Sequence, residues 1–179
     1  MSVSAKIEVI IKDACIFFDL IDLDMMHVFY KLELIVITTP EVINEIKDPA
    51  QLSIIQQYID TGSLQLDKTA ELMAVLGIIE TNPGLNLADA AVLDVATRRK
   101  ASVLSADKSL RNESARRGLT VRGLIWVIEE LFRKEILTKE QALKKLALYP
   151  QVNSRAPKKE IEILIAKLNK QNDDSIARS

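Results

Sequence analysis

Cysteine and histidine are nearly absent from this chain, which contains one residue of each, Cys15 and His27. A single cysteine excludes an internal disulfide and a cysteine-rich zinc site, and it is typical of a reducing compartment. His27 has no second histidine or cysteine nearby to complete a zinc site, so we predict a structural or exposed side chain. Cys15 has no evident base beside it to activate its sulfur, and we predict a buried thiol.

The chain also lacks a long uncharged apolar run and an excess of either charge. The first residues, MSVSAKIE, show no signal-peptide pattern, and no segment is apolar over the length needed to span a bilayer, so we expect a cytoplasmic protein. The 24 Lys and Arg residues balance 25 Asp and Glu residues, giving a net charge of -1. No overall basic field attracts nucleic acid, so any such binding must depend on a local patch.

Five short runs rich in β-branched residues predict strands. They lie at 8–12, 34–38, 64–67, 102–105 and 119–122. Each run is continuously apolar, as expected for strands that are covered on both faces. Segments of helical periodicity lie between them, and this alternation predicts an α/β fold with a mostly parallel sheet between helix layers.

The strand pattern stops after Gly123, and the remaining chain predicts helices over 124–135, 139–148 and 158–169. We expect residues 1–123 to form the α/β core, 124–170 a helical extension packed on the core or a partner, and 171–179 a flexible tail. The stretch PQVNSRAP at 150–157 is the expected hinge.

Acidic residues stand where the predicted strands end. Ligands of an open parallel sheet gather at the carboxyl ends of its strands. Asp13 ends the first run, and Asp107 follows the fourth. Asp89 stands in the first turn of a helix that starts at the same edge, and Glu45 lies in the helix after the second strand. We therefore expect these four acids to converge at one edge of the sheet.

Carboxylates gathered in this way predict a metal site. Several of them in a partly buried place repel one another and do not all stay ionised without a cation. Oxygen ligands suit Mg²⁺ or Mn²⁺. A bound divalent ion can activate a water molecule and neutralise the charge that builds on a phosphodiester. Phosphodiester hydrolysis is the reaction that this pattern favours.

Each acid also has a purely structural interpretation. Asp89 can be the third residue of a helix that Asn86 caps, and Asp107 can be the N-cap of the next helix. Glu45 can be a solvated surface residue, and Asp13 can begin the helix that follows it. For each acid alone, the structural interpretation explains the sequence as well as a metal site does. The placement of all four acids at one edge favours the metal site.

The segments around these acids resemble the PIN-domain superfamily, and within it the VapC-like toxin ribonucleases and related prokaryotic PIN-like proteins. The matching blocks are IIKDAC at 10–15, TTPEVINEI at 38–46, DAAVLDVA at 89–96 and VLSAD at 103–107. Each block alone is a short acidic motif in an apolar setting, whereas their order and spacing are fairly specific. The resemblance covers residues 7–123.

The resemblance implies a three-layer α/β/α sandwich, Mg²⁺ or Mn²⁺ as cofactor, and endoribonuclease activity on single-stranded or structured RNA. It also implies a toxin role restrained by a cognate antitoxin protein, and pairing through helices makes a homodimer the expected oligomer. It assigns metal binding and catalysis to Asp13, Glu45, Asp89 and Asp107. Ser105 would then orient a metal-bound water or a carboxylate.

Two departures from the family pattern bear on activity. Lys12 occupies a position that is usually apolar, and Ala106 and Ser109 stand where some relatives carry a further acid. A thinner acidic shell leaves an alternative: a catalytically weak or inactive PIN-like module that binds nucleic acid or protein.

Basic residues concentrate around the fourth predicted strand. Those predicted to contact phosphates are Arg98, Arg99, Lys108 and Arg111. Arg111 is favoured because it follows Asp107 by one helical turn. The alternative for Arg98 and Arg99 is that they are cations at the C-terminus of a helix.

Two other protein classes share features of this sequence. Asp22-Leu23-Asp24 resembles the nucleophile motif of haloacid-dehalogenase-like phosphatases, but Met25 and Met26 follow where Gly and Thr belong, and no strand leads into Asp22. A flavodoxin-like receiver domain shares the alternating pattern, but no switch threonine and lysine follow in order. The nuclease remains the favoured prediction.

Overall fold

The computed structural model describes residues 8–11 and 14–176, with side chains for 14–170. These residues divide into two compact units. Unit 1 contains the chain up to Phe18 and Glu33–Gly123, and unit 2 contains Asp19–Leu32 and the chain from Leu124 onward. The sequence grouped 19–32 with the α/β core, whereas the structure groups this segment with the C-terminal helices.

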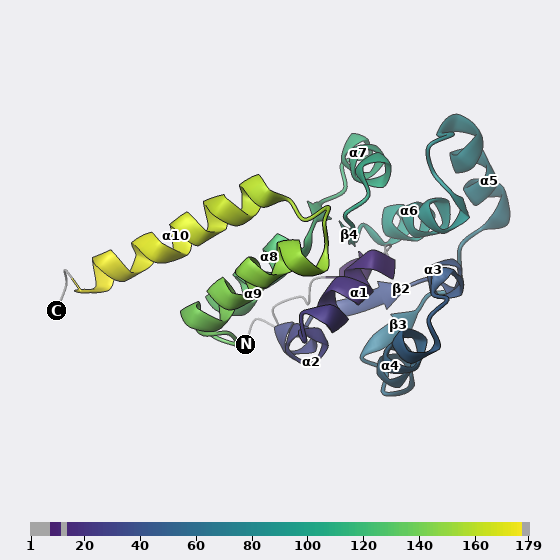
Figure 1. The fold of residues 1–179 in the computed structure, drawn as a ribbon. Coiled ribbons are helices and arrows are strands. Elements are labelled where there is room, and N and C mark those ends of the chain that lie inside the picture. The colour runs from purple at the N-terminus through teal and green to yellow at the C-terminus, as the bar shows by residue number, and fades with distance from the viewer. Residues whose placement is uncertain (1–7, 12–13, 177–179) are drawn as a thin grey trace, which may run out of the picture. The chain divides into compact units, whose positions relative to one another are not determined.

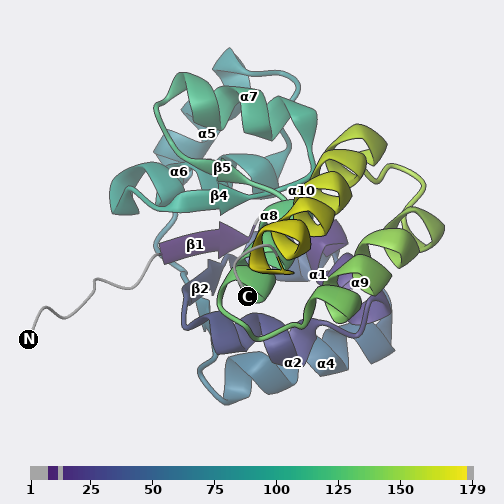
Figure 2. The same ribbon diagram turned by 90° about the vertical axis from the view of Figure 1, so that its left-hand side faces the viewer.

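A five-stranded sheet forms the centre of unit 1, in the order β3-β2-β1-β4-β5. Figure 1 labels three of its strands, β2, β3 and β4. The central strand β1 (Glu8–Ile11) pairs with β2 (Ile35–Thr38) on one side and with β4 (Ser102–Leu104) on the other. The outer strands are β3 (Leu64–Leu66) and β5 (Val121–Arg122). Every pairing is parallel, so all five carboxyl ends lie at one edge. Figure 2 shows β1, β4 and β5 side by side.

Helices cover both faces of this sheet within unit 1. The chain runs from β1 through β2 to β3, and then returns past β1 to β4 and β5. Because parallel crossovers are right-handed, the helices of the outward and the return run lie on opposite faces. Helix α4 (Pro49–Asp60) packs against β3, and α6 (Leu87–Arg99) packs against β1 and β4. The fold is therefore the α/β/α sandwich with a parallel central sheet that the sequence predicts.

Local signals start and end the helices of unit 1. Pro40 is the first residue of α3 (Pro40–Glu45), and Asp48 caps α4 by accepting hydrogen bonds from the amides of Ala50 and Gln51, at 2.8 and 3.0 Å. The left-handed residues Gly62 and Gly118, with φ of 73° and 75°, follow α4 and α7 (Lys108–Arg116).

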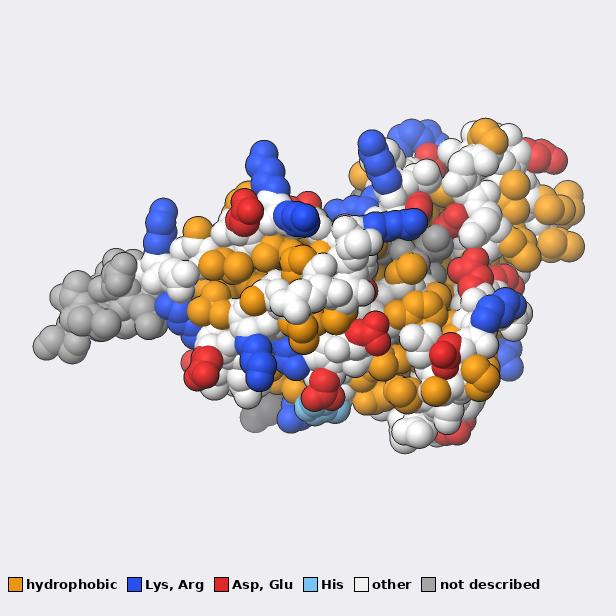
Figure 3. Space-filling view, in the orientation of Figure 1, with side chains coloured by type: hydrophobic (Ala, Val, Ile, Leu, Met, Phe, Trp, Pro, Cys, Tyr) orange, Lys and Arg blue, Asp and Glu red, His pale blue; other side chains and the backbone are white. Residues whose placement is uncertain are grey.

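Exposed apolar side chains concentrate on α5 (Leu72–Thr81). Leu72, Met73 and Leu76 are 67%, 79% and 42% exposed. The orange patch at the right-hand end of Figure 3 lies over this helix. No lysine or arginine occurs between residues 69 and 97, so the charged residues of α5 itself are acidic. Pairing of two copies through a helix stays a prediction.

Unit 2 is helical. It combines α2 (Met26–Phe29) and the 3₁₀ turn Tyr30–Leu32 with the three C-terminal helices. These are α8 (Leu124–Arg133), α9 (Lys139–Val152) and α10 (Lys158–Ile176). Helix α1 (Ala14–Asp22) begins in unit 1 and ends in unit 2. None of the described helices is long and apolar enough to cross a membrane.

Two boundaries in unit 2 differ from the sequence prediction. Helix α9 continues to Val152 with Pro150 inside it, where the sequence predicted the start of a hinge. A proline this close to a helix end removes one backbone hydrogen bond. Any kink that it causes affects only the last residues of the helix, so the helix tolerates it. Helix α10 continues to Ile176, into the stretch expected as a flexible tail.

Buried polar contacts fasten residues 19–32 to the C-terminal helices. Asp19 is 4% exposed and accepts hydrogen bonds from the Tyr149 hydroxyl and the Asn153 amide, each at 3.0 Å. The ammonium groups of Lys145 and Lys134 donate to the carbonyls of Leu23 and Leu32, at 2.6 and 2.8 Å. Contacts more than a hundred residues apart in sequence therefore hold this segment in unit 2.

In unit 1, Glu113 of α7 forms an ion cluster with two arginines. Its carboxylate accepts hydrogen bonds from Arg116 at 2.7 Å and from Arg117 at 2.8 Å, while its side chain is 7% exposed. The hydrogen bonds from Arg116 lower the pKa of Glu113 from 4.5 to about 2, against the opposing effect of burial and with the help of Arg117.

Replacing Glu113 should change how stability depends on pH. Because its pKa is lower in the folded chain, Glu113 stabilises the fold above about pH 4.5, and this contribution is lost as the pH falls towards 2. We expect Glu113→Gln to lower the free energy of unfolding at neutral pH and to flatten its slope between these pH values. Urea titrations at several pH values, followed by circular dichroism, measure this free energy. Glu162→Gln, at an exposed position, is the control, and a wild-type slope in Glu113→Gln would contradict the prediction.

Candidate active site

The strand order reverses between β1 and β4, and open parallel sheets bind their ligands at such a point. Ile11, the last residue of β1, is paired with Leu104, the last residue of β4. Asp13 follows β1 by two residues in the sequence and lies outside the described residues. The strand after which Asp13 stands is therefore the neighbour of the strand that leads to Asp107.

Ser105 and Asp107 form a rigid turn at the end of β4. Ser105 is fully buried, and its hydroxyl oxygen accepts a hydrogen bond from the Asp107 amide at 3.0 Å. Oδ1 of Asp107 accepts from the Leu110 amide at 2.8 Å, which caps α7 and leaves Oδ2 outside the cap. The structural interpretation of Asp107 as an N-cap is confirmed. The same cap holds a half-buried carboxylate at the carboxyl edge of the sheet.

Asn86 links Glu45 to Asp89. Its side-chain amide donates to Oε1 of Glu45 at 3.0 Å, and its backbone amide donates to Oδ2 of Asp89 at 2.8 Å. The Asp89 amide donates back to Oδ1 of Asn86, which completes a capping box at the start of α6. Asp89 is 4% exposed, whereas Glu45 is exposed. The structure therefore brings these two predicted acids together through a residue that the sequence suggested only as a cap.

Thr39 is a second residue that the sequence did not predict for the site. It follows β2, the other neighbour of β1, and it is fully buried. Its hydroxyl makes no hydrogen bond with the described residues, and it does not cap α3. Buried hydroxyls usually have a partner, so the hydroxyl of Thr39 remains available for a hydrogen bond to a ligand at the same edge. Its position directly before Pro40 is the only sequence signal that could have indicated it.

The described residues give a partial ligand set. Within 8–11 and 14–176, no three His, Cys, Asp or Glu side chains are grouped as a metal site would require. They provide two smaller groups, Glu45 with Asp89 and Asp107 with Ser105. All their donors are oxygen atoms, which suits a hard divalent cation. A complete site would need Asp13 to join the two groups.

Arg111 lies beside this edge, and part of its side chain has a structural role. Nη1 donates to the carbonyls of Ser105 and Arg122, at 2.9 and 3.0 Å. These bonds hold α7 to the ends of β4 and β5. Lys108 is exposed at the first position of α7, close in sequence to Asp107.

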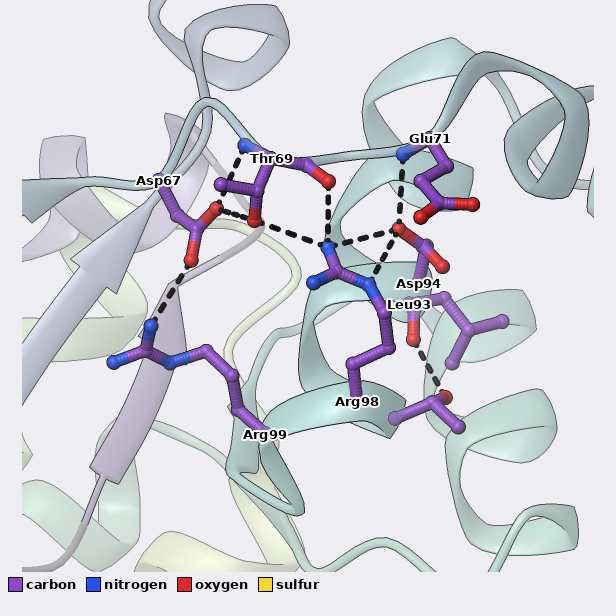
Figure 4. Close-up of polar contacts among 8 residues, drawn as sticks. Asp67, Thr69, Glu71, Leu93, Asp94, Arg98 and Arg99 are labelled. Atoms are coloured by element: carbon purple, nitrogen blue, oxygen red, sulfur yellow. Dashed lines mark hydrogen bonds and ion pairs between the residues drawn. The ribbon is translucent and has the colours of Figure 1, made fainter.

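Arg98 and Arg99 lie at the other end of α6 (Figure 4). Arg98 donates to Asp94 at 3.1 Å and to the Thr69 carbonyl at 2.9 Å, and Arg99 donates to Asp67 at 3.1 Å. At 1.5 Å per residue, Arg98 is about 13 Å along the helix from Asp89. The structure does not bring these two arginines together with the predicted acids. Their ion pairs match the alternative, cations at a helix C-terminus.

This polar network is a clamp between α6 and the chain that leads into α5. Asp94 also accepts from the Glu71 amide, at 3.2 Å, which fixes the residue before α5. Burial tends to raise the pKa of Asp67, but hydrogen bonds from Thr69 and the charges of Arg99 and Arg98 outweigh it, so the pKa is lowered. Both acids of the clamp are therefore structural.

Breaking the clamp should destabilise the fold. Asp94 is 7% exposed, and Asp94→Ala removes the acceptor of Arg98 and of the Glu71 amide, which should cost about 1–3 kcal/mol of unfolding free energy. Urea denaturation provides the measurement. The matched control is Asp60→Ala, which removes an exposed acid bonded to Gln56 and should change stability by less than about 0.5 kcal/mol. Equal losses in the two variants would argue against the clamp.

Comparison with known families agrees with the fold. A family model described as a PIN domain matches residues 9–170. The chain belongs to the PIN-domain family. The match extends beyond residue 123, where the resemblance read from the sequence ends, so the family pattern includes the C-terminal helices. No curated protein matches the chain. PIN domains are generally nucleases that use divalent metals.

Three further predictions have clear outcomes in this PIN domain. Cys15 is exposed, so the prediction of a buried thiol was wrong. Helix α1 begins at Ala14, one residue before Cys15, and the Cys15 side chain lies on its exposed side. His27 is exposed, as one of its two expected states, with Nδ1 3.9 Å from Asp24. Asp22 ends helix α1, and Asp24 lies in a turn with φ of 49°, so neither follows a strand as a phosphatase nucleophile would.

Proposed function

We propose that this PIN domain is a Mg²⁺- or Mn²⁺-dependent endoribonuclease. The observation that supports the proposal best is the Ser105–Asp107 turn at the end of β4, the strand paired with the one that precedes Asp13. The Glu45–Asn86–Asp89 group supplies further carboxylates from α3 and α6. In this proposal, Asp13, Glu45, Asp89 and Asp107 hold the metal.

The side chains of the chain itself have distinct roles in the proposed site. The helix cap holds Asp107 in one orientation, so one carboxylate oxygen is fixed while the other is outside the cap. Asn86 holds the otherwise exposed Glu45 close to Asp89. Ser105 accepts from Asp107 and keeps its own hydroxyl proton for a carboxylate or a water molecule. When bound, a divalent ion supplies Lewis acidity for phosphodiester hydrolysis.

RNA, single-stranded or structured, is the proposed substrate. The protein has no net positive charge, so phosphate contacts depend on local cations. Lys108 is exposed one residue after Asp107, and Arg111 has donors beyond the Nη1 atom that holds two backbone carbonyls. Arg98 and Arg99 are less suited to this role because both are in ion pairs.

A cleavage assay tests the proposal. We expect the purified protein to cut single-stranded RNA with Mn²⁺ or Mg²⁺ and to be inactive with EDTA. Asp13→Asn and Asp107→Asn should each lower the rate at least about a hundredfold, because each removes a metal ligand.

Asp48→Asn is a matched control for Asp107→Asn. Asp48 also caps a helix in unit 1, and asparagine caps about as well as aspartate, so both substitutions remove one charge and keep a cap. Asp48→Asn should cut RNA at the wild-type rate. If EDTA and Asp107→Asn both leave the cleavage rate unchanged, the activity comes from a contaminating nuclease, and this result would oppose the proposal.

A second candidate is a PIN module that binds nucleic acid or protein with little or no turnover. It is favoured by the incomplete ligand set of the described residues. It also agrees with the absence of a further acid at Ala106 and Ser109. If no RNA or DNA is cut with any divalent metal and no metal binds in calorimetry, this candidate replaces the nuclease.

We further propose a toxin role with a cognate antitoxin, which rests on the family resemblance of the four acidic blocks. Induced expression of the wild-type chain in a bacterial host should arrest growth, because cleaved RNA stops protein synthesis. Asp107→Asn should allow growth, and Asp48→Asn should arrest it. Equal growth of all three strains at equal protein levels would oppose the toxin role while leaving RNA processing open.

A further inference from the structure

A groove of about 330 Å³ lies in unit 1 between the loop before α6 and the side of α7. The loop contributes 81–85, and α7 contributes Ser109, Asn112, Glu113 and Arg116. Both walls continue directly into the proposed site. Leu85 precedes Asn86, which is bonded to Glu45, and Ser109 follows Asp107 by two residues.

Several polar groups of the groove are available to a ligand. The Asn112 side chain is exposed and makes no hydrogen bond with another described residue. Arg116 uses Nε and Nη2 on Glu113, which leaves Nη1 outside the ion pair, and its side chain is 69% exposed. Glu113 also lines the groove, and its charge is shared between Arg116 and Arg117, so the exposed guanidinium of Arg116 is the cation that the groove presents.

The loop side of the groove includes a proline and a glycine. Pro83 and Gly84 form the tip of the loop, and Gly84 has no side chain to fill the space. A Cβ atom built on Gly84 would lie 3.4 Å from the Ser109 hydroxyl oxygen, an ordinary van der Waals distance. The two walls therefore approach each other closely here, and even a modest side chain at this position would enter the groove.

We propose that this groove binds one unpaired nucleotide of the RNA substrate, next to the nucleotide that is cut. The inference rests on the proposed nuclease function. Asn112 offers both a donor and an acceptor to a base edge, and Arg116 offers a cation to the phosphate. The volume is at the lower end of the range of about 300–1,000 Å³ for small-ligand pockets, so one splayed nucleotide fits and a duplex does not.

An unpaired nucleotide suits the chemistry of the groove better than other ligands. Proteins recognise RNA sequence mainly in single strands, whose bases turn outward and expose hydrogen-bonding edges. The groove offers an amide, a hydroxyl and a guanidinium, which match a base joined to a phosphate, and its Glu113 carboxylate is already paired with Arg116. Because the groove begins beside Asp107 and Asn86, the bound nucleotide is a neighbour of the phosphodiester at the acidic edge.

Gly84→Leu tests the groove, with Gly77→Leu as its matched control. Leucine at 84 fills the groove, whereas a Cβ atom at Gly77, on the surface of α5, meets nothing within 4 Å. Binding is measured by fluorescence anisotropy with a labelled single-stranded RNA whose 2′-O-methyl riboses resist hydrolysis, in the presence of Ca²⁺. We expect Gly84→Leu to weaken binding at least about tenfold and Gly77→Leu to bind like the wild type.

Asn112→Ala provides a second variant that leaves the loop unchanged. Its side chain is exposed, so folding should be preserved, and binding should weaken about fivefold through the lost base contact. An RNA duplex of the same sequence should bind all variants equally. Thermal unfolding of each variant shows whether a loss of binding accompanies a loss of structure.

The outcomes separate the groove from the proposed function. If the wild type cuts RNA while Gly84→Leu and Asn112→Ala bind single-stranded RNA as the wild type does, the groove proposal is overturned and the nuclease proposal stands. If the wild type neither binds nor cuts RNA, both are overturned. Weaker binding by both variants with unchanged Gly77→Leu supports the groove.

Discussion

The pairing of β1 with β2 on one side and β4 on the other is the constraint on which the candidate site depends. It makes β1 the central strand and places the reversal of strand order between β1 and β4. The chain leaves this strand on one side of the sheet and returns on the other. Segments that carry acids at positions 45, 89 and 107 therefore belong to helices that start near a single edge.

Helix capping is the second principle of the site. Asp89 and Asp107 each accept hydrogen bonds at a helix start, so their carboxylates are held by the backbone before any ligand is considered. In the proposed site, Asp107 would use different oxygens for its two roles, because Oδ1 caps the helix and Oδ2 is outside the cap. A carboxylate held in this way loses little conformational freedom when it binds a ligand, because its rotamer is already fixed.

The sequence predicted the fold well because its signals are local. Short apolar runs predicted all five strands, and helical periodicity after Gly123 predicted the three C-terminal helices. It could not predict that 19–32 belongs with the C-terminal helices, because the deciding contacts, Tyr149 to Asp19 and Lys145 to Leu23, span more than a hundred residues.

For the site, sequence order predicted which acids stand at strand ends and helix starts, but not how side chains meet. The bond from Asn86 to Glu45 depends on how α3 and α6 pack together. The sequence favoured Arg111 over Arg98 and Arg99 for phosphate contact, but it did not show which acids the last two would meet. Arg98 and Arg99 lie at the end of the thirteen-residue helix α6 that is far from Asp89. At that end they form ion pairs with Asp94 and Asp67.

The grouping of Asp19–Leu32 with the C-terminal helices means that the chain passes between the two units three times, after Phe18, Leu32 and Gly123. A gene fragment that ended at Gly123 would encode Leu20, Leu23 and Phe29, which are buried in the full chain, without the helices of their own unit. Neither unit corresponds to one continuous stretch of the gene. The C-terminal helices are therefore not an independent module. Recombination that replaced them alone would leave residues 19–32 without the helices they pack against.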